Sequence, residues 1–398
     1  MIRVTHAQAR HFRLQKSFLA GPKAADIMTA IKGLVTLPAP DEIAPFLALR
    51  ARLAEFEPAD LPAELYQTRR LLRRPGPGNE PHVLAVADFG LILAATGRQR
   101  RQAFHTACLT WEVEAAEIEA LAEDVLAAIG ETPVTAAQLE AMLPPEKVRP
   151  LSQTSRGGRV SRSSTLQLAL QRLESEGRLA VGRPSPPADW REPAQSYAPP
   201  AVWWPNLDLS SDLSEAEAQR RLVWAYLAAY GPAGQADISF WSGFGQSETQ
   251  RAINALAAET TLVMVEGSPG AMLLLKEQSQ ALRDSRATEE PLISLLPADD
   301  PFVRAHQAGR AGLFAEPTPR RQRQIFNSAG RAKPTILVNG QIVGWWELLT
   351  EPEPAQLQWH YLAPVEPAIA AQIATALAEL GQFLGATLSA DAPAVDSI

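Results

Sequence analysis

Apolar residues recur at helical spacing through the N-terminal part of the chain. Ile27, Ile31 and Leu34 fall on one face of a predicted helix, and the same spacing recurs in the segment that follows. A turn rich in proline and glycine at residues 75–78 stops any helix there. The pattern therefore predicts a mostly helical segment from residue 1 to about residue 115.

The next segment repeats a helix–loop–helix order. Thr135 is placed to cap a short helix over residues 136–143, and Ser164 opens a second helix after a loop of about twenty residues. The second helix leaves Gln167 and Gln171 off an apolar face made of Leu166, Ala169, Leu170 and Leu173. A short strand is predicted next. Helix, turn, helix and strand in this order are typical of a winged helix-turn-helix.

The same order of helix, turn, helix and strand recurs further along the chain. Ser214 with Glu217 forms a predicted capping box for a helix that ends at Gly231-Pro232. Ser247 with Gln250 predicts a second capping box and a second helix. Two apolar runs, residues 262–265 and 272–275, then predict a hairpin of the wing type. Two winged-helix units in succession follow from the pattern.

From about residue 290 the periodicity changes to short apolar runs. Strands are predicted at residues 292–296, 335–338, 341–346 and 357–362, with a hairpin turn at Asn339-Gly340, followed by an alanine-rich helix over residues 368–384. The predicted fold class is α+β, with tandem winged helix-turn-helix domains before a small antiparallel β-barrel or sheet. The expected domains are 1–118 (helical or winged helix), 119–200 (second winged helix and linker), 201–285 (third winged helix), 286–390 (β-rich, with a terminal helix) and a disordered tail, 391–398.

The net charge at first argues against a polyanionic partner. The 398 residues carry a formal charge of −7, yet all but six of the 37 basic residues are arginines. Three islands, residues 69–101, 147–178 and 304–333, carry net charges of +5, +5 and +6. Because electrostatic attraction is screened beyond roughly 8 Å, local charge decides whether a phosphate backbone is bound. The distribution therefore permits a DNA partner.

Other counts exclude whole classes of protein. Cys108 is the single cysteine, so an internal disulfide and a cysteine-rich zinc module are excluded. No two of the six histidines lie four residues apart, and no uncharged apolar run approaches 18 residues. We therefore expect a cytoplasmic, nucleoid-associated monomer that needs no metal or cofactor and does not enter the membrane.

Several runs resemble one family. They are LVWAYLAAYGPAGQADISFWSG (222–243), LLPADDP (295–301), PTILVNGQIVGWWE (334–347), and ELYQTRRLLRR followed by HVLAVADF (64–74 and 82–89). In the order in which they follow one another along the chain, these runs resemble the AlkZ/YcaQ family of bacterial winged-helix DNA glycosylases, and the resemblance covers nearly the whole chain. The resemblance implies three tandem winged helices, a β-rich C-terminal domain and a basic concave surface for duplex DNA. It also implies metal-free hydrolysis of the N-glycosidic bond of alkylated or crosslinked purines, a step of base excision repair.

The chain departs from the family at the catalytic motif. Catalytic members carry Gly-Leu-Gln-x-Gln, or Gln-x-Asp in the YcaQ branch, where this chain has Gly33-Leu-Val-Thr-Leu37. Valine and leucine cannot accept or orient a proton. Catalysis could instead use Asp41, Glu42 and His82, which lie close to the motif or in a neighbouring family stretch. Alternatively the chain binds DNA or a lesion without hydrolysis, or acts as a winged-helix transcriptional regulator.

The basic islands supply the candidate DNA contacts. Residues of the second predicted winged helix are expected at phosphates and in the groove, and a cluster before the first turn is expected to hold a second stretch of backbone. These residues are Arg156, Arg159, Arg162, Ser164, Gln167 and Gln171, and Arg69, Arg70, Arg73 and Arg74. For Asp41 and Glu42 the competing reading is a helix N-terminus, and for His82 a buried structural histidine.

Overall fold

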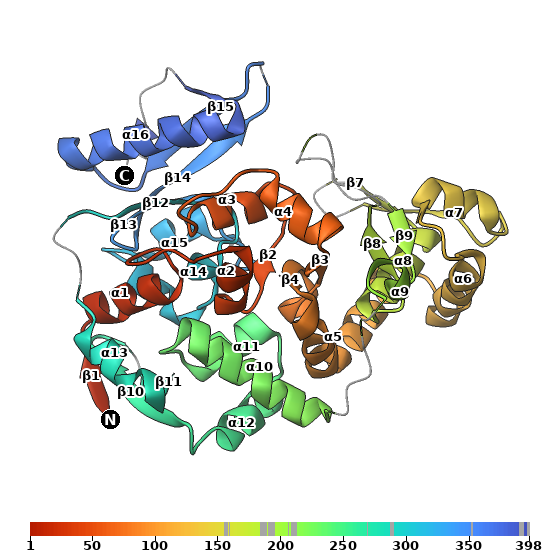
Figure 1. Ribbon diagram of the computed structural model, residues 1–398, viewed down its shortest axis with the longest axis horizontal. Coiled ribbons are helices and arrows are strands. Elements are labelled where there is room, and N and C mark those ends of the chain that lie inside the picture. The colour runs from red at the N-terminus through yellow and green to blue at the C-terminus, as the bar shows by residue number, and fades with distance from the viewer. Residues whose placement is uncertain are drawn as a thin grey trace. The chain divides into compact units, whose positions relative to one another are not determined.

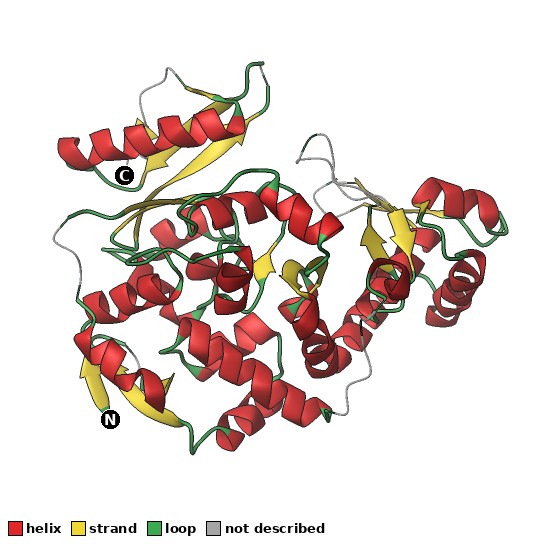
Figure 2. Cartoon of the chain, in the orientation of Figure 1, coloured by secondary structure: helices red, strands yellow, loops and turns green. Residues whose placement is uncertain are grey.

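The computed structural model describes the chain except for residues 155–157, 159, 184–188, 190–195, 206, 208–212, 269, 287–289, 352, 390–393 and 396–398. The chain forms two compact units (Figure 1). Unit 1 joins Met1–Phe56 to Val223–Ile398, and unit 2 is the intervening Glu57–Leu222. Helices and strands occur in both units (Figure 2), so the fold is a mixture of α and β structure.

Unit 1 begins with elements from both of its chain segments. The first segment contains β1 (Ile2–Val4), α1 (His6–Lys16), α2 (Ile27–Gly33), β2 (Leu37–Pro38) and α3 (Ala44–Arg50). Helix α10 (Glu215–Tyr230) crosses the boundary between the units. The second segment continues with α11 (Gln235–Ser242), α12 (Gln246–Ala255), β10 (Thr260–Val265), β11 (Met272–Leu275) and α13 (Ser279–Asp284). Strand β1 pairs in parallel with β10, which pairs antiparallel with β11, so the two segments share one sheet.

The rest of unit 1 is built around a six-stranded sheet. Its elements are β12 (Ile293–Leu296), α14 (Pro301–Arg304), η5 (Ala308–Leu313), α15 (Pro319–Ile325), β13 (Thr335–Val338), β14 (Gln341–Leu349), β15 (Gln356–Tyr361), α16 (Pro367–Leu384), β16 (Thr387–Leu388) and β17 (Ala394–Val395). Strands β12 to β15 pair antiparallel in sequence order. Asn339 and Gly340, both at positive φ, form the predicted turn.

The predicted antiparallel C-terminal sheet is only partly antiparallel. Strands β16 and β17 both pair in parallel with β15. Helix α16, which lies along this sheet in Figure 1, carries the chain back after β15 and so allows a parallel return. Of the predicted tail, residues 391–398, only β17 lies within the described residues.

Unit 2 contains two hairpins and several helices. Its elements are α4 (Asp60–Pro62), η1 (Ala63–Gln67), β3 (Leu71–Pro75), η2 (Pro77–Asn79), β4 (Pro81–Ala85), η3 (Val86–Asp88), α5 (Phe89–Thr110), α6 (Ala115–Ala128), β5 (Val134–Thr135), α7 (Ala136–Met142), β6 (Pro150–Thr154), β7 (Val160–Ser164), α8 (Thr165–Ser175), β8 (Ala180–Gly182), β9 (Ser196–Ala198) and α9 (Pro200–Trp203). Its apolar core gathers Ile118, Leu121 and Val125 of α6 against Leu166, Ala169 and Leu173 of α8.

Two stretches of unit 2 were predicted wrongly. Residues 71–85 form the β3–β4 hairpin instead of continuing the helical segment. The expected loop between α7 and α8 contains the β6–β7 hairpin. The β6–β7 hairpin was not recoverable from alternation, since its strands are almost wholly polar and exposed. The strands of the β3–β4 hairpin are largely buried and do not alternate either. The capping residues Thr135 and Ser164 are confirmed, because each accepts a hydrogen bond from the backbone three residues on.

The predicted cap of α12 was also wrong. The helix begins two residues earlier than Ser247 implies, with Glu248 Oε2 accepting from the N–H of Gly245. Glycine is tolerated at such a position, so the acidic side chain in the first turn decides the start. None of the described helices is long and apolar enough to cross a membrane.

Candidate active site and nucleic-acid interface

The loop that follows α2 contains the departure from the family motif and has an unusual backbone. Val35 has a φ of 66°, and the N–H of Thr36 donates to Leu34 O, two residues back, over 2.7 Å. A two-residue hydrogen bond around a central residue with positive φ is typical of the rare γ-turn. For a β-branched residue the positive φ is a strained conformation. Contacts from elsewhere in the chain must therefore hold the loop.

Tyr230, at the end of α10, supplies one such contact. Its hydroxyl donates to Leu34 O over 2.5 Å, inside the core. Burial raises the pKa of Tyr230 well above its usual value, so the hydroxyl remains a donor. The backbone oxygen of Tyr230 in turn lies 3.0 Å from His306 Nε2. Tyr226 and Trp241 pack their rings beside Tyr230.

A buried ion pair lies near the same tyrosine. Arg52 and Asp300 form two parallel hydrogen bonds of 2.7 and 2.8 Å, and both side chains are 0% exposed. Arg52 also donates to Ala48 O over 2.8 Å. The pair joins the segment after α3 to the start of α14. The pair holds these two segments together, because a single charge left unpaired in this buried position would lower the free energy of unfolding.

The two positions where the sequence resemblance leads one to expect a catalytic pair, Val35 and Leu37, carry apolar side chains. Leu37 is 0% exposed and Val35 is half-buried. Between them Thr36 is 1% exposed, and its hydroxyl has no hydrogen-bond partner among the described residues. A threonine hydroxyl is a poor proton acceptor compared with a carboxylate or imidazole. The loop as it stands offers no general base at the motif.

Two of the proposed substitutes for the motif, Asp41 and His82, make structural contacts. Asp41 Oδ1 accepts from the N–H groups of Ile43 and Ala44, over 2.8 and 2.7 Å, where α3 begins. This is the helix-start role that competed with catalysis, and Glu42 beside it is half-buried. His82 lies in unit 2 on β4, 4% exposed, with its Nδ1 2.8 Å from Glu80 O. The imidazole fits so closely that a β-carbon on Gly76 would approach its Nδ1 to 2.7 Å.

The first arginine cluster is divided by the β3–β4 hairpin. Successive side chains of a strand face opposite ways, so Arg74 points inward, 2% exposed, and donates to Leu179 O. Arg74 was predicted to contact DNA, and this prediction was wrong because the buried side chain is not accessible to a phosphate. Arg69 donates to Trp203 O over 3.0 Å, and Arg70 pairs with Glu64. Arg73 lies on the other face of the strand, where it is half-buried and therefore more accessible than Arg74.

The second arginine cluster is only partly described. Arg156 and Arg159 lie outside the described residues. Arg162 is exposed on β7 and pairs with no carboxylate in the described part of the chain. Gln167 and Gln171 are exposed on one face of α8, while Ser164 caps that helix. Four other basic residues of this island are paired locally, namely Lys147 with Asp124, Arg149 with Glu117, Arg172 with Glu176 and Arg178 with Glu123. Among the described basic residues of this island, Arg162 on β7 thus remains as the one without a carboxylate partner.

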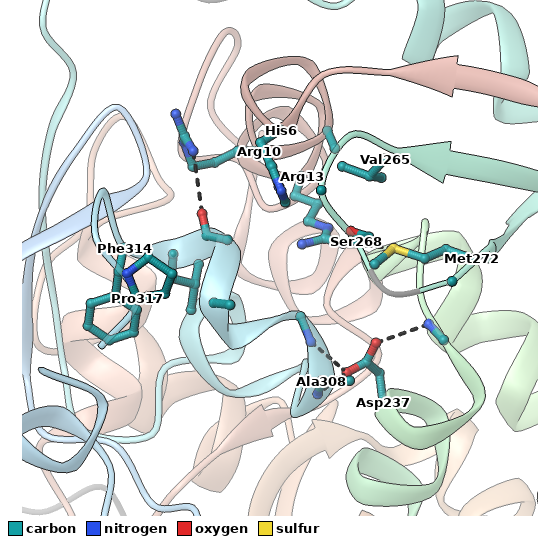
Figure 3. A pocket seen from close by; sticks show the side chains of 18 of the residues that line it. His6, Arg10, Arg13, Asp237, Val265, Ser268, Met272, Ala308, Phe314 and Pro317 are labelled. Carbon is teal, nitrogen blue, oxygen red and sulfur yellow. Dashed lines mark hydrogen bonds between the residues drawn. The ribbon is translucent and has the colours of Figure 1, made fainter. Parts of the chain in front are cut away.

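Asp237 caps its own helix, α11, and also holds the start of η5. Its Oδ1 accepts from the backbone N–H groups of residues 307, 308 and 309, and its Oδ2 accepts from Gly234 over 3.0 Å (Figure 3). Burial opposes its ionisation, but His306 and these N–H groups hold the pKa of Asp237 below its usual value. Among the described residues no cluster of His, Cys, Asp and Glu could hold a metal ion.

Comparison with known proteins decides the family. A family model described as "DNA glycosylase AlkZ-like" matches residues 31–383. The chain belongs to the AlkZ-like DNA glycosylase family. Among solved structures it is similar to the Streptomyces sahachiroi DNA glycosylase AlkZ, with 18% sequence identity and a TM-score of 0.72, over 98% of this chain and 100% of that one. No curated protein sequence matches.

The runs that resemble the AlkZ-like family have structural roles in this chain. Tyr230 holds the loop after α2, Asp300 neutralises Arg52, and the indole N–H of Trp346 donates to Leu296 O over 3.2 Å. These residues come from three of the runs quoted from the sequence, namely residues 222–243, 295–301 and 334–347. The AlkZ-like scaffold is therefore kept around a loop that lacks the polar pair.

Proposed function

We propose that the chain binds duplex DNA and recognises damaged purines without cleaving the glycosidic bond by the route of the catalytic AlkZ-like members. The observation that supports this proposal most directly is the burial of Leu37, at 0% exposed, on a loop with no proton acceptor at Val35. A hydrolytic water needs an acceptor within hydrogen-bond reach. Asp41 is engaged at a helix start and His82 is buried in a strand, so neither supports the catalytic alternative.

The DNA surface we propose lies on the β6–β7 hairpin and α8. Arg162, Gln167 and Gln171 are exposed there, and the two glutamines share one helix face. Arg156 and Arg159 belong to the same proposed surface by sequence. Arginine matches phosphate bidentately, and glutamine can hydrogen-bond base edges or phosphates. Arg69, Arg70 and Arg73 would hold a second stretch of backbone, without Arg74.

We assign winged helices to the segments 119–200 and 201–285. The order α6, α7, α8, β8 and β9 in the first and α10, α11, α12, β10 and β11 in the second supports this assignment. Residues 1–118 would form the N-terminal domain of the series, and residues 286–390 the β-rich domain. This organisation is a proposal from element order within each segment.

Binding is tested by fluorescence anisotropy with a labelled duplex. If phosphate contacts dominate, affinity falls steeply with salt and varies little with DNA sequence. Arg162→Gln should lower affinity about three- to tenfold and reduce the salt slope by about one. Arg286→Gln, which also removes an exposed arginine but lies in unit 1, serves as the matched control. A tight, sequence-selective site in a binding selection would instead favour the transcriptional regulator.

Hydrolysis is tested by incubating the purified protein with duplex DNA that carries N7-methylguanine or an interstrand crosslink. We expect neither base release nor unhooking above background over several hours, under conditions where the same preparation binds the duplex. Release at a rate that responds to protein concentration contradicts the non-hydrolytic proposal. In that case Asp41→Asn and His82→Gln identify which substitute acts.

A further inference from the structure

A pocket of about 460 Å³ lies within unit 1, away from the Gly33–Leu37 loop. It is bounded by α1, the turn between β10 and β11, the start of α11, and η5 (Figure 3). Its walls are mostly apolar, with Val265, Met272 and Phe314 among them. The volume lies in the range of small-molecule sites, which combine apolar walls with a few convergent polar groups.

The polar groups of the pocket come chiefly from one helix face. His6, Arg10 and Arg13 follow one another at spacings of four and three residues along α1, so their side chains project on the same side. Figure 3 shows the three side chains together at the pocket. His6 is accommodated between two backbones, since β-carbons on Gly267 and Gly312 would each lie 3.4 Å from a ring nitrogen.

The charged side chains at the pocket leave donors rather than acceptors without partners. Arg10 is oriented by Asn339 O, 2.9 Å from its Nε. Arg13 donates through Nη2 to Pro232 O over 2.7 Å, but its Nε is buried with no partner among the described residues. The acidic neighbour Asp237 already has both oxygens occupied by backbone N–H groups. Buried donors without partners are costly, and an oxyanion would satisfy them.

The electrostatics of His6 agree with this geometry. Burial and the charges of Arg10 and Arg13 lower the pKa of His6, while Glu266 raises it by a smaller amount. The balance shows that the positive charges outweigh Glu266 at the imidazole. A bound dianion would reverse that balance and raise the pKa of His6.

From these contacts we propose that the pocket binds a phosphate group, held by Arg10, Arg13 and His6, with the organic part of the ligand against the apolar wall. The remaining N–H groups of Arg10 and Arg13, together with the imidazole, offer donors to several oxygens of one phosphate, which a carboxylate would use less fully. The phosphate can come from a free mononucleotide or from the DNA backbone. The proposal does not depend on whether the chain hydrolyses DNA.

The first experiment titrates the full-length protein with inorganic phosphate and with adenosine 5′-monophosphate by calorimetry and by NMR of the histidine C–H signals. Saturable binding and an upward shift of the His6 pKa are expected. Arg13→Gln should weaken binding about tenfold or more, and His6→Gln about threefold. Arg3→Gln, an exposed arginine on β1 outside the pocket, should leave the affinity unchanged.

The second experiment distinguishes the sources of phosphate. If adenosine monophosphate binds and duplex DNA does not displace it, the ligand is a free nucleotide. If neither small anion binds but His6→Gln lowers duplex affinity at least threefold relative to Arg3→Gln, the ligand is the DNA backbone. Because His6 is exposed, His6→Gln should fold even if Arg13→Gln does not. The proposal is overturned if no small anion binds up to about 10 mM and the duplex affinities of His6→Gln and Arg3→Gln are equal.

Discussion

The hydroxyl of Tyr230 donates a hydrogen bond of 2.5 Å to the backbone oxygen of Leu34, 196 residues earlier in the chain. The same oxygen accepts from the N–H of Thr36. One carbonyl thus joins the end of α10 to the strained turn at Val35. A residue of one run that resembles the family thus holds the loop that contains Val35 and Leu37.

Removal of this hydroxyl should loosen the loop. Tyr230→Phe leaves Leu34 O with one donor fewer in a buried position, so the free energy of unfolding should fall by about 1 to 2 kcal/mol. Tyr226→Phe, which loses a hydrogen bond to Ala305 O, should cost a similar amount. Denaturant unfolding measures both. Hydrogen exchange at the Thr36 amide should quicken only in Tyr230→Phe, and equal protection in the two variants would contradict the proposed hold on the loop.

Glycine should be tolerated at Val35. The positive φ costs a β-branched residue about 1 to 3 kcal/mol, whereas glycine adopts it freely and costs about 0.5 to 1 kcal/mol in the unfolded chain. We expect Val35→Gly to be at least as stable as the parent in thermal and denaturant unfolding. Val125→Gly, at a fully buried helical position in unit 2, should lose several kcal/mol. A loss above about 1 kcal/mol at Val35 would show that its packing outweighs the strain.

The buried ion pair should behave as a unit. Asp300→Ala leaves Arg52 charged and unpaired at 0% exposure, which should cost about 3 to 5 kcal/mol. Replacing both partners, as in Arg52→Met with Asp300→Leu, should cost less than the sum of the single changes, because no charge is then left alone. A double-mutant cycle by urea unfolding measures the difference. Additive losses would argue that the two side chains act independently.

Stability should depend on pH through His306. Burial, followed by the charge of Arg13, lowers the pKa of His306 from 6.5 to about 3. Between these values the unfolded chain binds a proton that the folded chain does not, so the free energy of unfolding rises with pH, by up to about 1.4 kcal/mol per unit. The gain is complete above about pH 6.5 and is progressively lost as the pH falls towards 3. Asp237, whose pKa is lowered, adds a loss of the same sign in acid.

The assignment of this pH dependence to His306 can be tested with variants. His306→Gln keeps a donor near Tyr230 O but removes the titration, so its free energy of unfolding should change less between pH 6.5 and pH 4 than that of the parent. His105, an exposed histidine of unit 2, provides the control variant His105→Gln, in which the slope should persist. An unchanged slope in His306→Gln would assign the pH dependence to other groups.

Local signals in the sequence were sufficient for many elements. Ser164 was placed correctly as a helix cap, and Asn339-Gly340 as a hairpin turn, since both depend on neighbours within a few residues. The hairpins at residues 71–85 and 150–164 were missed. The polar strands of the second hairpin carry no alternation, and in the first hairpin the buried Arg74 looks like any other arginine in the sequence.

The candidate site was less predictable because it depends on distant contacts. The role of Tyr230 and the pairing of Arg52 with Asp300 link residues about 200 or more positions apart. His6, Arg10 and Arg13 do show a signal, namely their helical spacing at the start of the chain. That spacing indicates a shared face but not the pocket that the face completes.

Unit 1 is assembled from the two ends of the chain, and this has a consequence for its synthesis. The partners of Ile2 and Arg52 are Val263 and Asp300, which the ribosome adds more than two hundred residues later. At about 5 to 20 residues per second, the first segment must wait on the order of ten seconds to a minute before its core exists. Unit 2 is complete earlier in translation. The N-terminal segment should therefore be the region most exposed to chaperones and proteases while the chain is being made, and truncation at the C-terminus should unfold the N-terminus as well.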